Sequence, residues 1–140
     1  MLPPAVTVHG PADARRALAP GRPVTLLSAE GAACFAGCAW WRALVDRARA
    51  DAPGVEAPDV LDCADSPGRA VEALRAGCRW IVLAPSCPAF ADVVARAESV
   101  GAAVLAERPA ALDLRPARRG HDPGRGLEAW LRRDRNAPMG

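Results

Sequence analysis

Short apolar runs that alternate with helical segments dominate this sequence and constrain its fold more than any other feature. The clearest run, 80–84, reads Trp-Ile-Val-Leu-Ala and is continuous and branched. Comparable runs lie at 6–9, 23–27, 60–63 and 103–105. Continuous apolar strands alternating with helices are typical of a parallel sheet covered on both faces. We therefore predict an α/β fold with three layers and a mainly parallel sheet of about five strands.

Helix start and stop signals separate these runs. Ser66 and Pro67 form an N-cap and first-turn pair, and Gly77 ends the helix that they open. Gly101 likewise stands between a predicted helix and the strand at 103–105. The repetition of strand, helix and glycine favours one folding unit built from repeated strand-helix pairs.

Two arrangements of such a sheet are compatible with the pattern, an open sheet and part of a closed barrel. An open, doubly wound sheet needs about five strands, and the run 111–114 could add a sixth at one edge. A closed eight-unit barrel typically needs about 250 residues, so this chain could supply only half of one. Half a barrel would leave strand edges exposed, and we prefer the open sheet.

The chain has 140 residues, the size of a single domain. We assign the α/β domain to 1–114 and treat 115–140 as an Arg-rich C-terminal tail. The tail holds seven arginines against three acidic residues. It is expected to be flexible or to pack on a partner subunit. Because Trp130 is its only aromatic residue, we do not expect nucleic-acid binding.

The sequence contains no lysine, since all 18 basic residues are arginine. Schiff-base enzymes, pyridoxal-phosphate enzymes and phosphate-loop nucleotidases all depend on a lysine. These classes are therefore excluded, and no particular cofactor is indicated.

The five cysteines and the N-terminus bear on location. An odd count without a secretory signal indicates reduced thiols in a cytoplasmic protein. The longest apolar stretch, 32–41, is far shorter than the roughly 20 residues of a membrane span. We expect a cytoplasmic protein that does not enter a membrane.

Any ligand site should lie at the carboxyl ends of the strands, where ligands bind in parallel sheets. Four loops follow the first four predicted strands there. Their polar and small residues are His9, Ser28, Glu30, Gly31, Asp62, Cys63, Asp65, Ser66, Ser86 and Cys87. We select Ser28, Gly31, Asp65, Ser66 and Ser86 from this set as candidate ligand-binding residues, and a small anion is a compatible ligand.

The segment 63–69, Cys-Ala-Asp-Ser-Pro-Gly-Arg, is the sharpest local pattern. It resembles the phosphate loop of cysteine-dependent phosphatases and, more loosely, the active loop of rhodanese-type sulfurtransferases. The resemblance implies that Cys63 is a nucleophile and Arg69 an oxyanion clamp. The residue that follows the segment, Ala70, departs from the phosphatase pattern, which has a hydroxyl residue at this position. The alternative is an ordinary helix start after a small buried cysteine.

Cys87 is a second candidate nucleophile, because it lies between a strand and a helix where a thiol pKa can be lowered. His9 is the only histidine of the predicted domain and could act as its base across the rim. The alternative for both is a structural role in turns. No metal site is predicted, because no Cys-x-x-Cys or His-x-x-x-His pair occurs.

The segment 32–49 is predicted to be the longest helix, and its front half is apolar nearly all round. Adjacent Trp40 and Trp41 point about 100° apart on a helix, so two surfaces are needed to bury both. Phe35 widens the apolar surface further. Core packing is one explanation, and a homo-oligomer interface formed by this helix is the other.

Two functions from different classes remain. The first is a small ligand-binding or accessory α/β protein that self-associates and to which no reaction can be assigned. The second is a cysteine-dependent enzyme, phosphatase-like or sulfurtransferase-like, that uses Cys63 or Cys87.

Overall fold

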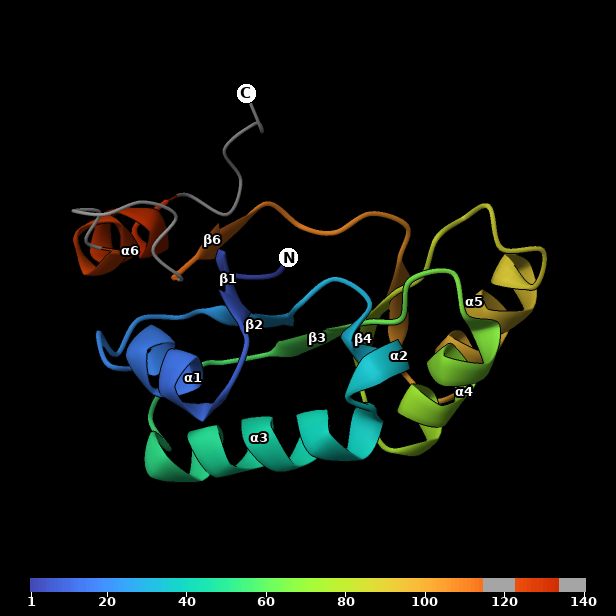
Figure 1. Cartoon of the computed structure of the whole chain (residues 1–140), viewed down its shortest axis with the longest axis horizontal. Coiled ribbons are helices and arrows are strands. Elements are labelled where there is room, and N and C mark those ends of the chain that lie inside the picture. The colour runs from blue at the N-terminus through green and yellow to red at the C-terminus, as the bar shows by residue number, and fades with distance from the viewer. Residues whose placement is uncertain (115–122, 134–140) are drawn as a thin grey trace.

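The computed structural model describes residues 1–114 and 123–133 and contains a six-stranded sheet (Figure 1). Every pair of neighbouring strands is parallel. The α/β class with a mainly parallel sheet is thus confirmed, with six strands instead of about five. The strands are β1 (Ala5–Val8), β2 (Thr25–Ser28), β3 (Asp59–Asp62), β4 (Trp80–Val82), β5 (Ala103–Leu105) and β6 (Ala111–Asp113).

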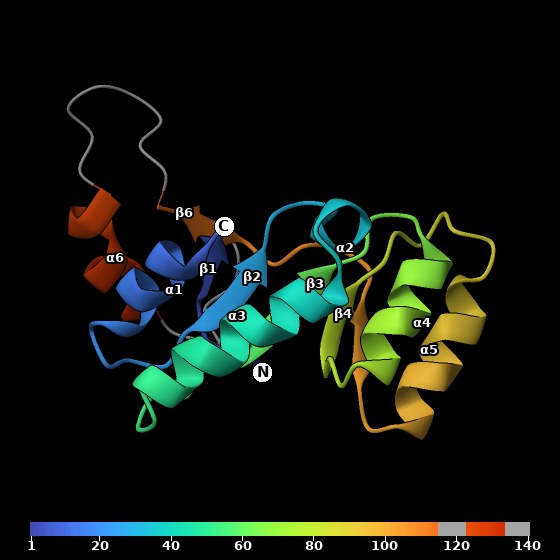
Figure 2. The ribbon, with the colours of Figure 1, turned by 60° about the horizontal axis from the view of Figure 1, so that its bottom comes forward.

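Helices lie on both sides of this sheet. In Figure 1, α3 lies below the strands and α6 above them. Figure 2 shows α3, α4 and α5 following one another across the sheet. The described helices are α1 (Pro11–Leu18), α2 (Ala32–Phe35), α3 (Cys38–Asp51), α4 (Pro67–Arg75), α5 (Phe90–Ser99) and α6 (Pro123–Leu131).

The strand order, β5-β4-β3-β2-β1-β6, reverses at β1. The chain first moves outward from β1 to β5, and it then returns to place β6 on the other side of β1. The sheet is therefore open, and the edge strand expected at 111–114 is present. A reversal of this kind leaves a crevice at the carboxyl ends of the two strands that flank it.

Local sequence signals explain where most elements begin and end. The Ser66 hydroxyl accepts a hydrogen bond of 3.3 Å from the Arg69 backbone N–H and so caps α4, and Pro67 occupies its first turn. Gly77 follows α4 with φ of +95°, a left-handed conformation that glycine adopts without strain.

The single helix expected at 32–49 is instead two helices, α2 and α3. They are separated by Ala36 and Gly37, and Gly37 has φ of +88°. A residue in this conformation cannot continue a right-handed helix.

The sheet has a different apolar cluster on each face, because alternate side chains of a strand point to opposite faces. The larger cluster joins Val6, Leu26, Leu61 and Ile81 to the helices. The smaller cluster is formed by strand residues and the N-terminal segment, with Ala5, Leu27, Val60 and Val82 buried at its centre. The alternation fixes which residues at each strand end face which side.

A buried carboxylate, Asp59, anchors α3 at the start of β3. Its oxygens accept hydrogen bonds from Trp41 Nε1 at 3.1 Å and from Arg42 Nη1 at 3.0 Å. Arg49 also donates to it. Asp59 is 5% exposed, and it lies at the opposite end of β3 from the predicted rim. This cluster holds α3 in place and leaves the carboxyl ends of the strands free for a site.

Part of the predicted tail is described by the structure. In α6, Leu127 and Leu131 are buried, and Trp130 Nε1 donates a hydrogen bond of 2.7 Å to the Ala5 backbone oxygen. Positions 115–122 and 134–140 lie outside the described residues, so the prediction for the tail as a whole stays a prediction. None of the helices in the described ranges has the length and apolar character needed to cross a bilayer.

Candidate functional site

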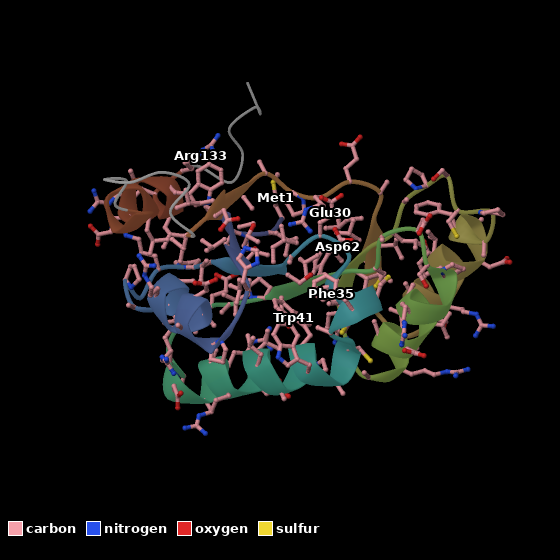
Figure 3. All side chains as sticks on the ribbon, in the orientation of Figure 1. Met1, Glu30, Phe35, Trp41, Asp62 and Arg133 are labelled. Carbon is pink, nitrogen blue, oxygen red and sulfur yellow. The ribbon has the colours of Figure 1, made fainter. Side chains whose placement is uncertain are left out.

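A pocket of about 470 Å³ opens at the carboxyl ends of β1, β2 and β6, where the strand order reverses. In Figure 3, Glu30, Asp62 and Phe35 are labelled in this part of the molecule, away from Arg133, which follows α6. The volume lies within the roughly 300–1,000 Å³ typical of small-molecule sites. The pocket is lined by Thr7, Val8, His9, Ala29, Glu30, Ala32, Phe35, Trp40, Arg108 and Asp113.

A histidine-aspartate pair forms the wall on the β1 and β6 side. Thr7 and Asp113 are register partners, so the residues at the ends of the two strands lie side by side. His9 Nε2 is 3.2 Å from Asp113 Oδ2. The His9 backbone N–H donates at 2.9 Å to Asp13 in the first turn of α1. The contact with Asp113 orients the imidazole ring beside the pocket, and the contact with Asp13 holds the His9 backbone at the start of α1.

A second polar group, Arg108, comes from the connection between β5 and β6. Its Nη1 donates at 2.7 Å to Asp62 Oδ2, and its Nη2 donates at 3.0 Å to the Ser28 backbone oxygen. Asp62 is 2% exposed, and its other oxygen accepts from the Ala64 backbone N–H at 2.8 Å. Arg108 therefore ties the ends of β2 and β3 together while it lines the pocket.

Aromatic rings form the wall on the α2 and α3 side. Phe35 is 72% exposed and Trp40 is 37% exposed, whereas Trp41 is completely buried. The Trp40 and Trp41 rings are 6.2 Å apart between centroids and tilted by 42°. Trp41 thus belongs to the core, and within the 32–49 segment Phe35 and Trp40 are the exposed aromatic rings that border the pocket.

Glu30 lies in the turn between β2 and α2, at the mouth of the pocket. Its side chain is exposed, and no ion pair involves it among the described residues. The next residue, Gly31, has φ of +68° and allows the sharp turn into α2. Gly31 does not line the pocket, but its conformation places Glu30 and Ala32 on the lining.

The Cys63 thiol lies inside the core, away from this pocket. Cys63 is fully buried, and its Sγ contacts the Leu61 backbone oxygen at 3.8 Å. Burial, together with the neighbouring Cys78 and Asp62, raises the Cys63 pKa to about 12. Arg69 is exposed and pairs with Glu72 at 3.0 Å. Neither Cys63 nor Arg69 lines the pocket.

The other predicted residues have local partners or lie elsewhere on the rim. The Ser28 hydroxyl donates to the Ala29 backbone oxygen at 3.0 Å and accepts from the Asp62 backbone N–H at 2.9 Å. Ser66 caps α4, and its neighbour Asp65 is exposed. These contacts give Ser28 and Ser66 structural roles.

The loop after β4 places its two predicted residues differently. Cys87 is 6% exposed, and its backbone oxygen accepts from the Phe90 N–H at 3.0 Å at the start of α5. Ser86 is exposed. Neither residue lines the pocket with His9. Of the nine predicted site residues, the structure places only His9 on the pocket wall.

Sequence reasoning did not include Thr7, Glu30, Arg108 and Asp113 among the selected site residues. Asp113 ends a strand, so the rule applied to the first four strands would have found it if β6 had been included. Arg108 carries no such signal, because it lies in a loop and reaches the pocket through contacts with residues 46 and 80 positions earlier in the chain.

Within residues 1–114 and 123–133, no group of three or more His, Cys, Asp or Glu side chains is arranged to hold a metal ion. The fold and the pocket together define an open α/β protein with a pocket of about 470 Å³ at its strand-order reversal. No protein-family model matches this chain, and no curated protein matches it either.

Proposed function

We propose that this protein binds a small organic molecule in the pocket at the carboxyl ends of β1, β2 and β6. The observation that carries the proposal is a cavity of about 470 Å³ at the strand-order reversal that combines exposed aromatic rings with converging polar groups. Pockets that bind small molecules are largely apolar and hold a few placed polar groups. Here Phe35 and Trp40 supply the apolar wall, and His9, Glu30 and Arg108 supply the polar groups.

Cysteine chemistry receives less support. A thiol attacks as the thiolate, and a Cys63 pKa of about 12 leaves little thiolate at neutral pH. Cys87 is buried and lies outside the pocket that His9 lines. Non-covalent binding is therefore our proposal, and the location that we propose from the cysteine count is the cytoplasm.

Self-association remains part of the proposal in a narrower form. Trp41 is buried by its own chain, which leaves Phe35 and Trp40 as the apolar side chains that a second copy could cover. Large exposed apolar groups mark interaction sites as well as ligand sites. Light scattering on the wild type and on Phe35→Ser tests this: a dimer that dissociates in the variant supports self-association, and a wild-type monomer at high concentration contradicts it.

The ligand proposal is tested with a library of aromatic fragments, measured by ligand-observed NMR at about 1 mM, the weak end of measurable affinity. Ala29→Trp places an indole in the pocket, and Val100→Trp is the matched control because Val100 is exposed outside the lining. Fragments should bind the wild type and the control and lose at least about tenfold in affinity for Ala29→Trp.

A second variant keeps the proposal testable if the Ala29→Trp protein does not fold. Phe35→Ala removes an exposed ring, so the fold should be unaffected while fragment binding weakens. The proposal is wrong if no fragment binds, or if the fragments bind both pocket variants with the same affinity as the wild type.

A further inference from the structure

We infer, on the basis of the proposed ligand site, that the ligand is a nucleoside: a planar heteroaromatic ring joined to a sugar with a vicinal diol, without a phosphate group. The structural basis is the placement of Phe35, Trp40 and Glu30 around one pocket. The pocket lies next to the β1–α1 turn, where the His9 backbone N–H donates to Asp13.

The ring is held by the aromatic wall. Phe35 and Trp40 both line the pocket, and 72% and 37% of their surfaces are exposed, an unusual amount for side chains of this size. The fully buried Trp41 packs against Trp40 and holds it in place before a ligand arrives. Stacking of a base on an aromatic side chain stabilises the complex and tolerates different bases.

The diol is held by Glu30, which lies two residues beyond the end of β2. A carboxylate only accepts hydrogen bonds, and its two oxygens can accept one from each hydroxyl of a diol. In the dinucleotide-binding members of this fold class, an acidic residue about 20 positions after the first strand-helix turn accepts a hydrogen bond from the ribose 2′-hydroxyl. Glu30 stands 20 positions after Gly10, the N-cap of α1, although this turn lacks the glycine-rich sequence of dinucleotide sites.

The turn between β1 and α1 argues against a phosphate. Phosphate binding there relies on free backbone N–H groups and a helix N-terminus without negative charge. The His9 N–H instead donates to the Asp13 carboxylate, which places an anion in the first turn of α1. Arg108, which lines the pocket, pairs with the buried Asp62 carboxylate, so its positive charge is already balanced by a carboxylate of the chain.

The test compares four probes by isothermal titration: adenosine, 2′,3′-dideoxyadenosine, adenosine monophosphate and free ribose. Adenosine should bind, dideoxyadenosine should bind at least about tenfold more weakly, and the monophosphate should also bind more weakly than adenosine. Guanosine, cytidine and uridine are titrated as well, because stacking alone does not select the base.

The Glu30→Gln variant distinguishes the contact with the diol from the other contacts between the protein and the nucleoside. It should weaken adenosine by about tenfold and leave dideoxyadenosine unchanged, so that the two ligands bind equally. Glu98→Gln, an exposed substitution on α5, is the matched control and should preserve the difference.

Three results overturn the inference: none of the ribonucleosides binds, the monophosphate binds more tightly than adenosine, or Glu30→Gln preserves the preference for the diol. Tighter monophosphate binding would support the small anionic ligand expected from the sequence. If no nucleoside binds, but aromatic fragments bind the wild type and lose affinity for Ala29→Trp, the nucleoside inference is wrong and the proposed ligand site stands. If neither class binds, both proposals are wrong.

Discussion

Arg108 donates a hydrogen bond of 2.7 Å to the buried carboxylate of Asp62, which lies 46 residues earlier in the chain. The same guanidinium donates to the backbone oxygen of Ser28 at 3.0 Å. A single side chain from the β5–β6 connection thus joins the ends of two central strands at the edge of the pocket.

The first prediction concerns this contact. Arg108→Ala should lower the free energy of unfolding by about 1–3 kcal/mol, because it leaves a nearly buried Asp62 oxygen without its charged partner. Arg69→Ala is the control: it removes an exposed ion pair with Glu72 and should change stability by less than about 1 kcal/mol. Urea denaturation measures both, and equal effects would mean that the Arg108 contact contributes no more than a surface pair.

The second prediction concerns Asp59 at the opposite end of β3. Asp59→Ala should cost about 3–5 kcal/mol, since it leaves Arg42, Arg49 and the Trp41 N–H without their shared acceptor. Asp46→Ala removes an exposed partner of Arg42 and should cost less than about 1 kcal/mol. Thermal unfolding followed by circular dichroism distinguishes the two variants. Similar midpoints would contradict the anchoring role of Asp59.

The third prediction concerns alkaline pH. Burial raises the Cys63 pKa to about 12 and the Cys78 pKa to about 11, from an ordinary value of 9.0. Because the folded state keeps these thiols protonated, their contribution to stability is fully present below about pH 9 and is lost as the pH rises through the folded-state values. The free energy of unfolding should fall by about 1–3 kcal/mol between about pH 8 and about pH 10.

The chain has no lysine or tyrosine, whose side chains would titrate in the same pH range. The change in the free energy of unfolding is therefore easier to assign to the thiols. In the double variant Cys63→Ala and Cys78→Ala, the dependence on pH should flatten even if the variant is less stable overall. A wild-type stability that stays constant up to about pH 10 would show that the two thiols ionise equally in both states.

The fourth prediction concerns thiol reactivity. Iodoacetamide at neutral pH should modify exposed Cys34 first and half-buried Cys38 more slowly. Cys63, Cys78 and Cys87 are buried and should react only after the protein is denatured. Peptide mass spectrometry over time gives the order. Early modification of Cys63 or Cys87 would favour the alternative hypothesis, a cysteine-dependent enzyme.

The elements of the fold could be predicted because their signals are local. The run containing Ile81 and Val82 is a strand, Ser66 and Pro67 open α4, and Gly77 follows it. The break at Gly37 was missed, because glycine is tolerated inside helical patterns and its φ of +88° depends on how the following helix packs.

The candidate site was predicted less completely. The rule that ligands bind at the carboxyl ends of parallel strands pointed to the edge of the sheet where the pocket lies, and it selected His9, which lines that pocket. It could not separate Asp62 from Cys63, which are adjacent in sequence. The pleat directs them to opposite faces, so Asp62 meets Arg108 while the Cys63 thiol enters the core.

The amino-acid sequence by itself determined the kind of fold and pointed to the end of the sheet at which the pocket lies. Strand propensity, capping and turn formation act over a few neighbouring residues, so they can be recognised without coordinates. Only the tertiary structure decided that Arg108, Asp113 and the exposed rings of α2 and α3 share a pocket with His9. That arrangement depends on the chain returning from β5 to pair β6 with β1, which brings together residues that are distant in sequence.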